Sequence, residues 1–547
     1  MVARLARWCV TAYEGLRTPR RTQSLVALCA LAVTLYAVCY PLVVTRYLPL
    51  TDFPFHAAQT SILRHYYDPS FHFHEQYTLH PIEVPYISMY VLGAVFALLL
   101  PITTASKLMA ALMLGLLPAG LAVLFWGMKK TPLWGLLGVL FVWSNLTYWG
   151  FLNYQGAIGL YAMSIGLALR ALDKPSRKRS IALALCITAV YLTHVFRLPF
   201  TLLSVAGTAL VMYPATKRIR PVLGPLLWGS ALLGLYALVR PKDDTVGKLD
   251  FNLHRERLSE VQQHLWTDYV GLAAKEEAAR VDGVIAAAVV ALIVAAVLFW
   301  WQGRLKHRSA EERWWGFGVT LLPLLFAGGY LLSYLMLPMR IGVWWYVYPR
   351  ELTACGFILL GVIPDMPRQW WYRLAFVVGL GLFVGRFGLF VAEQFHAFDR
   401  STEDFQHVVE HIPEAPRLLY LVFDHSGSSK RNTPYIHLPA WVQAEKGGWL
   451  SFHMVGFNHS PIRYRKDTNP TLYDGRGVIP PAVPDRWEWT PQRFRLQTHG
   501  VFFDWFLVRQ RSDPARLFAS DPSIHLVAHE GTWWLFQREK DSPSSQQ

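Results

Sequence analysis

The sequence predicts an α-helical polytopic membrane protein that ends in a small α/β domain. Hydrophobic residues make up 53% of the 547 residues and charged residues only 16%, which is too apolar for a soluble chain of this length. Apolar runs of about 17–25 residues, the length that crosses a bilayer as a helix, recur between residues 24 and 392. Residues 393–547 instead combine strand-like and helix-like patterns.

The distribution of charge supports the membrane interpretation. The formal net charge is +15, yet the polar tail from Glu393 onward holds 17 basic and 18 acidic residues. The basic excess therefore lies in the apolar part, in the short segments between the runs. Basic residues in such positions are typical of cytoplasmic loops. The charge indicates orientation in a membrane, and we expect no nucleic-acid partner.

The N-terminal segment predicts the orientation of the first span. Residues 1–23 contain five arginines and one glutamate, and the apolar run 24–44 follows directly. This run is longer than the apolar core of a typical cleaved signal peptide and has no clear small-residue cleavage site. We therefore expect an uncleaved first span with a cytoplasmic N-terminus.

Eleven of the twelve apolar runs are predicted to cross the membrane. The exception is 86–101, which begins after Pro85 and stops at Pro101. Counting it as a span would place the most basic loop, 174–179, outside; a juxtamembrane helix in the outer interface leaves every short basic loop inside. The predicted spans are 24–44, 105–127, 132–150, 155–172, 180–196, 198–213, 221–239, 282–302, 316–337, 351–364 and 373–392.

This topology divides the chain into a transmembrane domain, 24–392, and an extracytoplasmic α/β domain, 393–547. The long polar segments 47–104, which includes the juxtamembrane helix, and 240–281 become outer loops. In the tail we expect strands at 417–424, 504–509 and 523–528, and helices at 439–446 and 513–518. The tail contains no cysteine, so disulfides do not hold it together.

The first outer loop begins with the segment TDFPFHAAQ, residues 51–59. An acidic residue at a membrane boundary is costly unless it is solvated or functional. If a helix begins near Pro54, Asp52 lies at its N-terminus, where its charge is favoured. Asp52 is therefore either a helix cap or a functional acid, with His56 one helical turn later.

A histidine-rich segment follows and offers weak candidates for a divalent metal site. Imidazole and carboxylate groups suit such an ion, and Mg²⁺ or Mn²⁺ is a possible cofactor. The segment lacks a fixed metal-ligand spacing, so a surface loop with aromatic-belt residues is the alternative. The candidate ligands are His72, His74, Glu75 and His80.

The sequence resembles the GT-C superfamily of membrane glycosyltransferases. DFPFHAAQ is similar to the D-x-P-x-H-x-A motif of bacterial GT-C-like proteins, and LHPIEVPYISMYVL corresponds to a segment followed by a juxtamembrane helix. WGFLNYQGAIGLYAMSIGLAL and YLTHVFRLP also resemble recurrent segments of this group. The resemblance implies a GT-C-like fold in a protein of the bacterial inner (plasma) membrane. It also implies transfer of a hexosyl or pentosyl group from a polyprenyl-phosphate donor to a glycan, lipid or protein acceptor on the extracytoplasmic face.

Such a transfer requires a base for the acceptor hydroxyl and cations for the leaving phosphate. Asp52 is the candidate base and His56 its partner. Arg350 either pairs with the adjacent Glu351 or binds phosphate. His194 and Arg197, one helical turn apart, are expected to share a helix face. The candidate substrate-binding residues at the outer ends of the spans are Asn153, Tyr154, His194, Arg197, Arg340 and Arg350.

Two alternative functions remain open at this level. A transporter or flippase for a lipid-linked substrate would place paired ionisable residues deep in several spans, and the predicted spans have almost none. A catalytically inactive GT-C-like scaffold is the second alternative, because many GT-C enzymes carry an acidic pair where this chain has Asp52 alone. The polar tail would bind the acceptor, contact a partner or cover the cavity.

Overall fold

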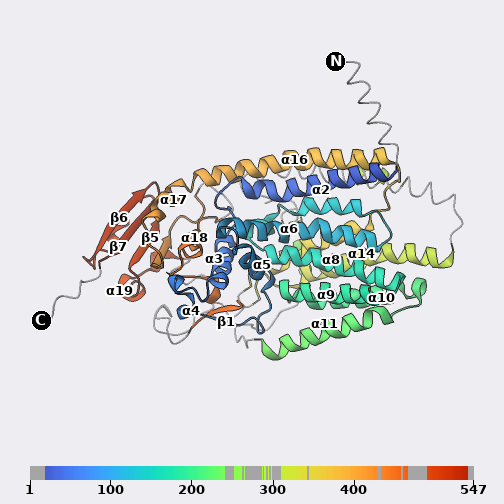
Figure 1. The fold of residues 1–547 in the computed structure, drawn as a ribbon, viewed down its shortest axis with the longest axis horizontal. Helices are drawn as coiled ribbons and strands as arrows, with labels where there is room; N and C mark the ends of the chain where they lie inside the picture. The colour runs from blue at the N-terminus through green and yellow to red at the C-terminus, as the bar shows by residue number, and fades with distance from the viewer. Residues whose placement is uncertain are drawn as a thin grey trace, which may run out of the picture.

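The computed structural model describes residues 19–240, 252–261, 309–341, 344–427, 433–456, 460–465 and 490–539, with isolated positions between 264 and 297. Long helices lie side by side along the longest axis, and a mixed sheet packs at one end of this bundle (Figure 1). The long helices are α2 (Pro19–Val43), α6 (Ile102–Gly127), α8 (Leu152–Asp173), α9 (Arg177–Thr193), α10 (Arg197–Thr216), α11 (Arg220–Val239), α14 (Ala310–Met336), α15 (Val347–Leu359) and α16 (Trp370–Arg400).

Seven helices among the described residues are long and apolar enough to cross a membrane, and they include all of these except α9 and α15. The multi-pass helical architecture is as predicted. The helix α9 has 17 residues and α15 has 13, although each coincides with a predicted span. The predicted span 282–302 lies largely outside the described residues. The last helix continues beyond the predicted limit at 392 to Arg400.

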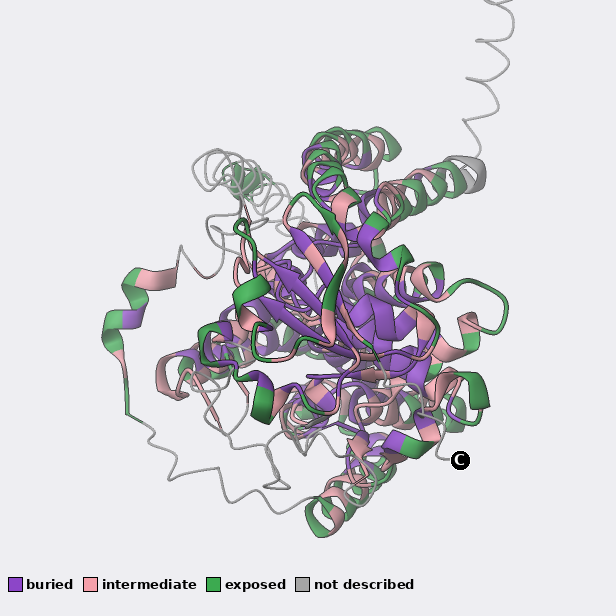
Figure 2. Ribbon diagram, turned by 90° about the vertical axis from the view of Figure 1, so that its left-hand side faces the viewer, coloured by how far each residue is buried: buried purple, intermediate pink, exposed green. Residues whose placement is uncertain are grey.

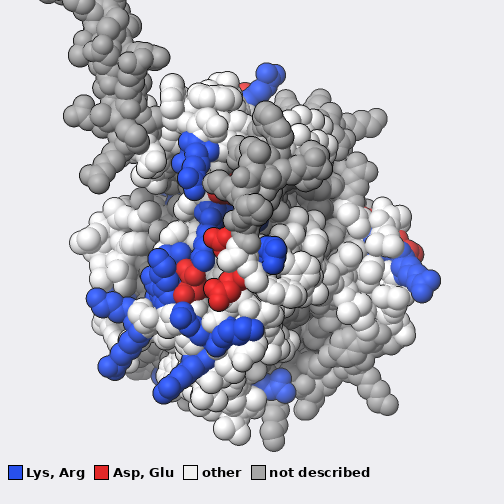
Figure 3. Space-filling model, turned by 90° about the vertical axis from the view of Figure 1, so that its right-hand side faces the viewer, with Lys and Arg blue, Asp and Glu red and all other residues white. Residues whose placement is uncertain are grey.

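The predicted basic loops come together at the end of the bundle opposite the sheet. Lys129 forms an ion pair with Asp173 at 2.7 Å, which joins the loop after α6 to the end of α8. Lys130 donates to the carbonyl oxygen of Gly361 at 2.8 Å, which adds the segment after α15. Figure 3 shows Lys and Arg side chains around a few acidic groups on this face. We call this the basic end of the bundle.

The short helix α5 (Ser88–Phe96) covers the run that was expected not to span. Its nine residues rise only about 14 Å, less than half the thickness of a hydrocarbon core. Lys107, near the start of α6, donates to the backbone carbonyl of Thr45, just beyond the end of α2. The chain therefore begins α6 at the same end of the bundle where α2 finishes.

The prediction of one spanning helix at 132–150 was wrong in its local structure. The segment forms a 3₁₀ helix, η2 (Pro132–Phe141), and a short helix, α7 (Asn145–Trp149). A Cβ at Gly138 would overlap backbone atoms of Leu117 and Pro118 in α6. This close backbone approach, which only glycine permits, packs η2 directly against α6.

The C-terminal domain, residues 401–539, is built on a five-stranded mixed sheet. The strand order is β3-β2-β5-β7-β6, with β2 (Arg417–Val422) parallel to β3 (Trp449–Leu450) and to β5 (Trp505–Arg509). The strand β7 (Trp533–Arg538) is antiparallel to β5 and to β6 (Ile524–Glu530). The central strands are buried (Figure 2), which is why β2 and β5 read as continuous apolar runs.

Most predicted elements of this domain are present. Three of the strands coincide with predicted ones, and α18 (Ala440–Lys446) ends at Gly447, as expected from the glycine pair. The predicted helix at 513–518 is only a 3₁₀ turn, η8 (Ala515–Leu517). The short sequence DPAR provides a turn and too few residues for an α-helical nucleus.

The C-terminal domain is attached to the first loop at several points. The helix α18 packs against α3 (Phe53–Arg64), with Trp441 touching Phe53 at a ring distance of 5.9 Å. The strand β1 (Tyr77–Leu79) pairs antiparallel with β4 (Ile462–Tyr464).

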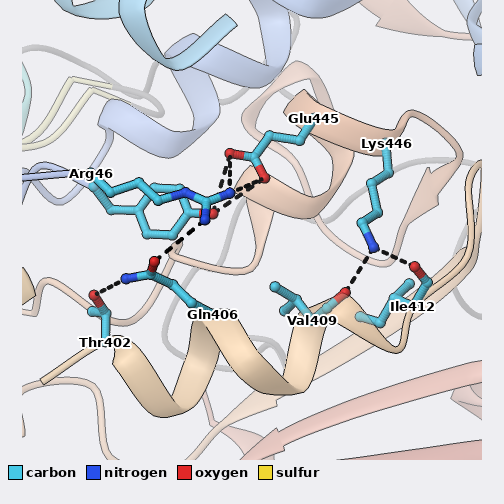
Figure 4. Close-up of polar contacts among 8 residues, drawn as sticks. Arg46, Thr402, Gln406, Val409, Ile412, Glu445 and Lys446 are labelled. Carbon is cyan, nitrogen blue, oxygen red and sulfur yellow. Dashed lines mark hydrogen bonds and ion pairs between the residues drawn. The ribbon is translucent and has the colours of Figure 1, made fainter. Parts of the chain in front are cut away.

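Figure 4 shows polar contacts around α17 (Glu403–Glu410), and those of Arg46 attach the C-terminal domain to the segment after α2. Arg46, just after α2, contacts Gln406 of α17 and Glu445 of α18. Within the C-terminal domain, Lys446 of α18 donates to the backbone carbonyl of Val409, in the last turn of α17, and to that of Ile412, just after this helix. The contacts of Arg46 therefore join the C-terminal domain to the segment that follows α2.

Candidate functional site

A cavity of about 480 Å³ lies between the helix ends and the C-terminal domain. Six of the sequence-predicted site residues line it, although they come from five separate segments of the chain. These residues are Asp52, His56, Asn153, His194, Arg340 and Arg350. The arrangement is that of an enclosed binding site formed where several elements end together.

Asp52 caps α3 by position but does not use its side chain as a cap. Its backbone N–H donates to the carbonyl of Trp149 at 3.2 Å, and no side-chain cap hydrogen bond forms. The side chain is 23% exposed and faces the cavity. Burial raises the pKa of the Asp52 carboxyl to about 7, although the charge of Arg350 opposes part of this increase. A carboxylate with that pKa is suited to accept a proton near neutral pH.

His56 is held by hydrogen bonds at both ring nitrogens. Its Nε2 lies 3.1 Å from the carbonyl oxygen of Gly150, which can only accept, so this nitrogen carries the proton. Its Nδ1 then accepts from the Tyr90 hydroxyl at 3.0 Å. Burial lowers the pKa of His56 to about 4, so the ring is neutral at pH 7. His56 therefore fixes the Gly150 turn against the start of α3.

Glu351 pairs with Arg197, so the alternative in which Arg350 pairs with Glu351 is wrong. The Arg197 guanidinium contacts both Glu351 carboxylate oxygens, one at 2.8 Å, and both side chains are buried. Arg197 consequently lies beneath the cavity and does not line it. A bidentate, fully buried pair satisfies both charges within the apolar interior.

Arg350 is positioned by backbone groups and aromatic rings. Its Nε donates to the carbonyl of Tyr346 at 3.0 Å, and its guanidinium lies 3.7 Å from the centre of the Phe151 ring. Within the described residues Arg350 forms no ion pair, so its charge is directed to the cavity. The hydroxyl of Tyr154 donates to the Arg350 backbone carbonyl at 2.9 Å, which places Tyr154 behind the cavity wall.

His194 and Arg197 do not share one helix face, contrary to expectation. The helix α9 ends at Thr193, His194 is its C-cap, and α10 begins at Arg197. The turn between them directs His194 into the cavity and Arg197 into the interior. Pro199 in the first turn of α10 is compatible with a helix start, which explains the break in what could have been one continuous run.

Aromatic side chains form much of the remaining wall. Trp344 and Trp345 line the cavity, as do Tyr86, Tyr90, Trp149 and Phe151. Flat aromatic faces stack on sugar rings and on the chain of a lipid, so this wall suits an amphipathic ligand. Tyr346 and Tyr348 instead pack behind it, bonded to Asn145 and Glu260.

The C-terminal domain supplies wall residues that the sequence did not indicate. His437, Phe452, Met454, Ser460 and Pro461 all line the cavity. The Nε2 atom of His437 lies 3.7 Å from Oδ1 of Asp52. These residues follow the first loop by almost 400 positions, and the packing of α18 on α3 and the pairing of β4 with β1 bring them there. Of the roles considered for the tail, this geometry favours covering the cavity and contacting its ligand.

The histidine-rich segment does not assemble the donor set of a metal centre. His72 contacts Glu75 at 2.7 Å, and His80 contacts Glu83 at 3.0 Å, so the side chains are used in separate pairs. Across the part of the chain that the structure describes, no three His, Cys, Asp or Glu side chains are placed to hold one ion. These residues do not fit the Mg²⁺ or Mn²⁺ ion considered from the sequence.

Comparison with known proteins identifies the fold. The chain matches the crystal structure of ArnT from Cupriavidus metallidurans bound to undecaprenyl phosphate, with a TM-score of 0.51 and 12% identity. The match covers 94% of this chain and 98% of ArnT. The arabinofuranosyltransferase AftD from Mycobacteria matches with a TM-score of 0.44 and 15% identity, over 95% of this chain and 40% of AftD.

No family model and no curated protein matches the sequence. ArnT is a GT-C membrane glycosyltransferase, so the GT-C-like fold expected from the sequence is confirmed.

Proposed function

We propose that the chain is a membrane glycosyltransferase that transfers a sugar from a polyprenyl-phosphate donor to a hydroxyl acceptor at this cavity. The observation that carries the proposal is the placement of Asp52 and Arg350 in one aromatic-walled cavity. One group is a carboxyl with a pKa of about 7, and the other is a cation without a carboxylate partner among the described residues. These are the base and the phosphate ligand that glycosyl transfer requires.

The cationic part of the cavity is the donor phosphate subsite. Arg340 and Arg350 both line it, beside Trp344 and Trp345 at the ends of α14 and α15. A guanidinium binds phosphate with two parallel hydrogen bonds and stabilises the charge that grows as the sugar leaves. The undecaprenyl phosphate bound by ArnT, which shares the fold, supports a lipid donor of this class.

Asp52 acts as the base for the acceptor. Its carboxylate takes the hydroxyl proton as the acceptor oxygen bonds to the anomeric carbon, and the donor phosphate leaves with the electron pair of the broken bond. His56 is a positioning residue, because both of its ring nitrogens are engaged by Gly150 and Tyr90. Asn153 and His194 contribute hydrogen-bonding groups to the same wall. By the positive-inside rule, the basic end is cytoplasmic and the site is extracytoplasmic.

The proposal is tested with the full chain in lipid nanodiscs and a panel of undecaprenyl-phosphate-linked hexoses and pentoses. Bacterial envelope membranes provide the acceptors. We expect one donor to release undecaprenyl phosphate in an acceptor-dependent reaction, which Asp52→Asn abolishes. Undecaprenyl phosphate alone should bind the wild-type chain. Absence of both binding and turnover across the panel would reject the proposal, and movement of intact donor between leaflets would favour a flippase.

A further inference from the structure

His437 of the C-terminal domain faces the proposed base directly. Its Nε2 lies 3.7 Å from Oδ1 of Asp52, slightly beyond hydrogen-bond length. Both side chains line the cavity, and that of His437 is only 2% exposed. Catalytic hydrogen bonds are often long before substrate binds and shorten in the complex. Shortening of this kind would bring Nε2 of His437 within hydrogen-bond distance of the Asp52 carboxylate.

The position of His437 is fixed by packing on the helix that carries Asp52. Its ring lies 4.1 Å from that of Phe55, three residues after Asp52 on α3. The next segment, α18, packs against α3 through Trp441 and Phe53. The imidazole is therefore packed against α3 on the side that faces the Asp52 carboxylate.

We infer that His437 is a positioning residue that donates a hydrogen bond to the Asp52 carboxylate and keeps it ionised for proton transfer. This inference rests on the proposed function of Asp52 as a base. It assigns a catalytic contribution to the C-terminal domain, whose residues complete the site and do more than cover it.

The chemical state of the ring is consistent with this role. Burial lowers the pKa of His437 well below its usual range, and nearby His425 and His453 lower it further. The neutral ring places its single proton on one nitrogen, and a proton on Nε2 is directed at a pure acceptor. Among the described residues, Arg350 on α15 and Tyr90 on α5 interact electrostatically with Asp52, and His56, His194 and Arg340 line the same cavity. Of these, the two ring nitrogens of His56 are already occupied.

The test measures the ionisation of Asp52 without any substrate. Infrared difference spectra of the full chain in nanodiscs are recorded against pH, and the carboxyl band lost in Asp52→Asn is assigned to Asp52. His437→Phe keeps a ring against Phe55 but removes the donor, and we expect the Asp52 midpoint to rise by about one pH unit. His437→Gln retains an N–H donor near the Nε2 position and should restore the midpoint to within about 0.3 units.

His453→Phe is the matched control. His453 packs on the same Phe55 ring at 4.7 Å but does not line the cavity, so the Asp52 midpoint should not change. An unchanged midpoint in His437→Phe, or an equal shift in His453→Phe, overturns the inference. If the Phe variant does not fold, His437→Leu replaces it under the same criteria.

This readout is independent of turnover. If the midpoint shifts as expected but no donor is consumed, the pairing of His437 with Asp52 stands and the proposed function fails. If the wild-type chain transfers sugar and the midpoint does not shift, the proposed function stands and the role of His437 fails.

Discussion

Glu351 forms its ion pair with Arg197, 154 positions away, and not with Arg350, its neighbour in the chain. The pair neutralises one arginine in the apolar interior beneath the cavity. It also fixes the start of α15, so that the next arginine points to the cavity with its charge uncompensated by a carboxylate among the described residues. Two adjacent residues thus have different surroundings: Glu351 is paired in the interior, and Arg350 lines the cavity.

Removing the charge of Glu351 should destabilise the fold. Glu351→Gln leaves Arg197 as a buried cation without its counter-charge, and we expect a loss of about 3–5 kcal/mol of unfolding free energy. Thermal unfolding of the detergent-solubilised chain measures this loss as a lower Tm. The double variant Arg197→Met with Glu351→Leu removes both charges and should recover most of the stability. A wild-type Tm in Glu351→Gln would show that the pair is not needed.

Removing the charge of Arg350 should weaken phosphate binding while leaving the fold intact. Arg350→Gln loses a charge-assisted contact, so we expect undecaprenyl phosphate to bind about 10–100 times more weakly. Native mass spectrometry of the chain with titrated lipid measures the change. Arg46→Gln is the control, because Arg46 is half-exposed and lies at the attachment of the C-terminal domain, outside the cavity. Equal losses in the two variants would exclude a specific phosphate subsite.

The activity should increase with pH through the pKa of Asp52. The base must be ionised, and its pKa in the folded chain is about 7. We therefore expect kcat/KM to rise between about pH 6 and pH 8, with the midpoint near the pKa of the free enzyme. A rate independent of pH across this interval would argue against Asp52 as the base.

The same shift makes ionised Asp52 a cost to stability. The folded chain favours the protonated carboxyl more than the unfolded chain does. The stabilisation from this protonated group is complete below the unfolded pKa of 3.8 and is lost as pH rises to about 7. Asp52→Asn keeps the side chain neutral, and its Tm should exceed that of the wild type at pH 8. The difference should disappear near pH 4. A constant difference at both pH values would contradict the raised pKa.

Gly150 should be needed for the exact position of Asp52. Its φ is +88°, and a Cβ there would lie 3.0 Å from the Cβ of Asp52. Gly150→Ala would strain the turn and push the carboxylate, and displacements of about 1 Å can reduce rates about 100-fold. We expect a loss of kcat of at least about tenfold with a modest decrease in Tm. Gly115→Ala, at an open helix position, is the control. Normal kcat in Gly150→Ala would show that the turn tolerates the displacement.

Local sequence patterns predicted those elements whose structure depends on residues close together in the chain. The position of Asp52 before α3, the limits of α18 at Gly447 and the buried strand β2 all follow from residues within a few positions. The positive-inside rule predicts that the run 86–101 does not span, and the nine-residue helix α5 that forms there is too short to span by itself. The 3₁₀ geometry of η2 was not predictable, since it depends on the backbone of α6 packed against Gly138.

Residues of the candidate site that lie at the ends of predicted spans could be predicted from the sequence. Residues that meet only through contacts between distant segments could not. Six predicted residues line the cavity because helix ends at one face converge. Arg197 was misjudged because its partner, Glu351, lies on another helix. No pattern in the sequence around His437 indicated a site residue. Its position near Asp52 depends on how the C-terminal domain, which begins after the last span, packs against the first loop. The spacing of residues in the tail therefore does not indicate that His437 lies in the cavity.

The most direct test is sugar transfer by wild-type and Asp52→Asn chains in nanodiscs, with the donor identified from the undecaprenyl-phosphate panel. Both samples are first shown to be folded and to bind undecaprenyl phosphate equally, so that only the chemical step differs. We predict that Asp52→Asn binds the lipid and remains folded but loses at least about 99% of the wild-type rate, as expected when a general base is removed. Wild-type turnover by Asp52→Asn would contradict the account.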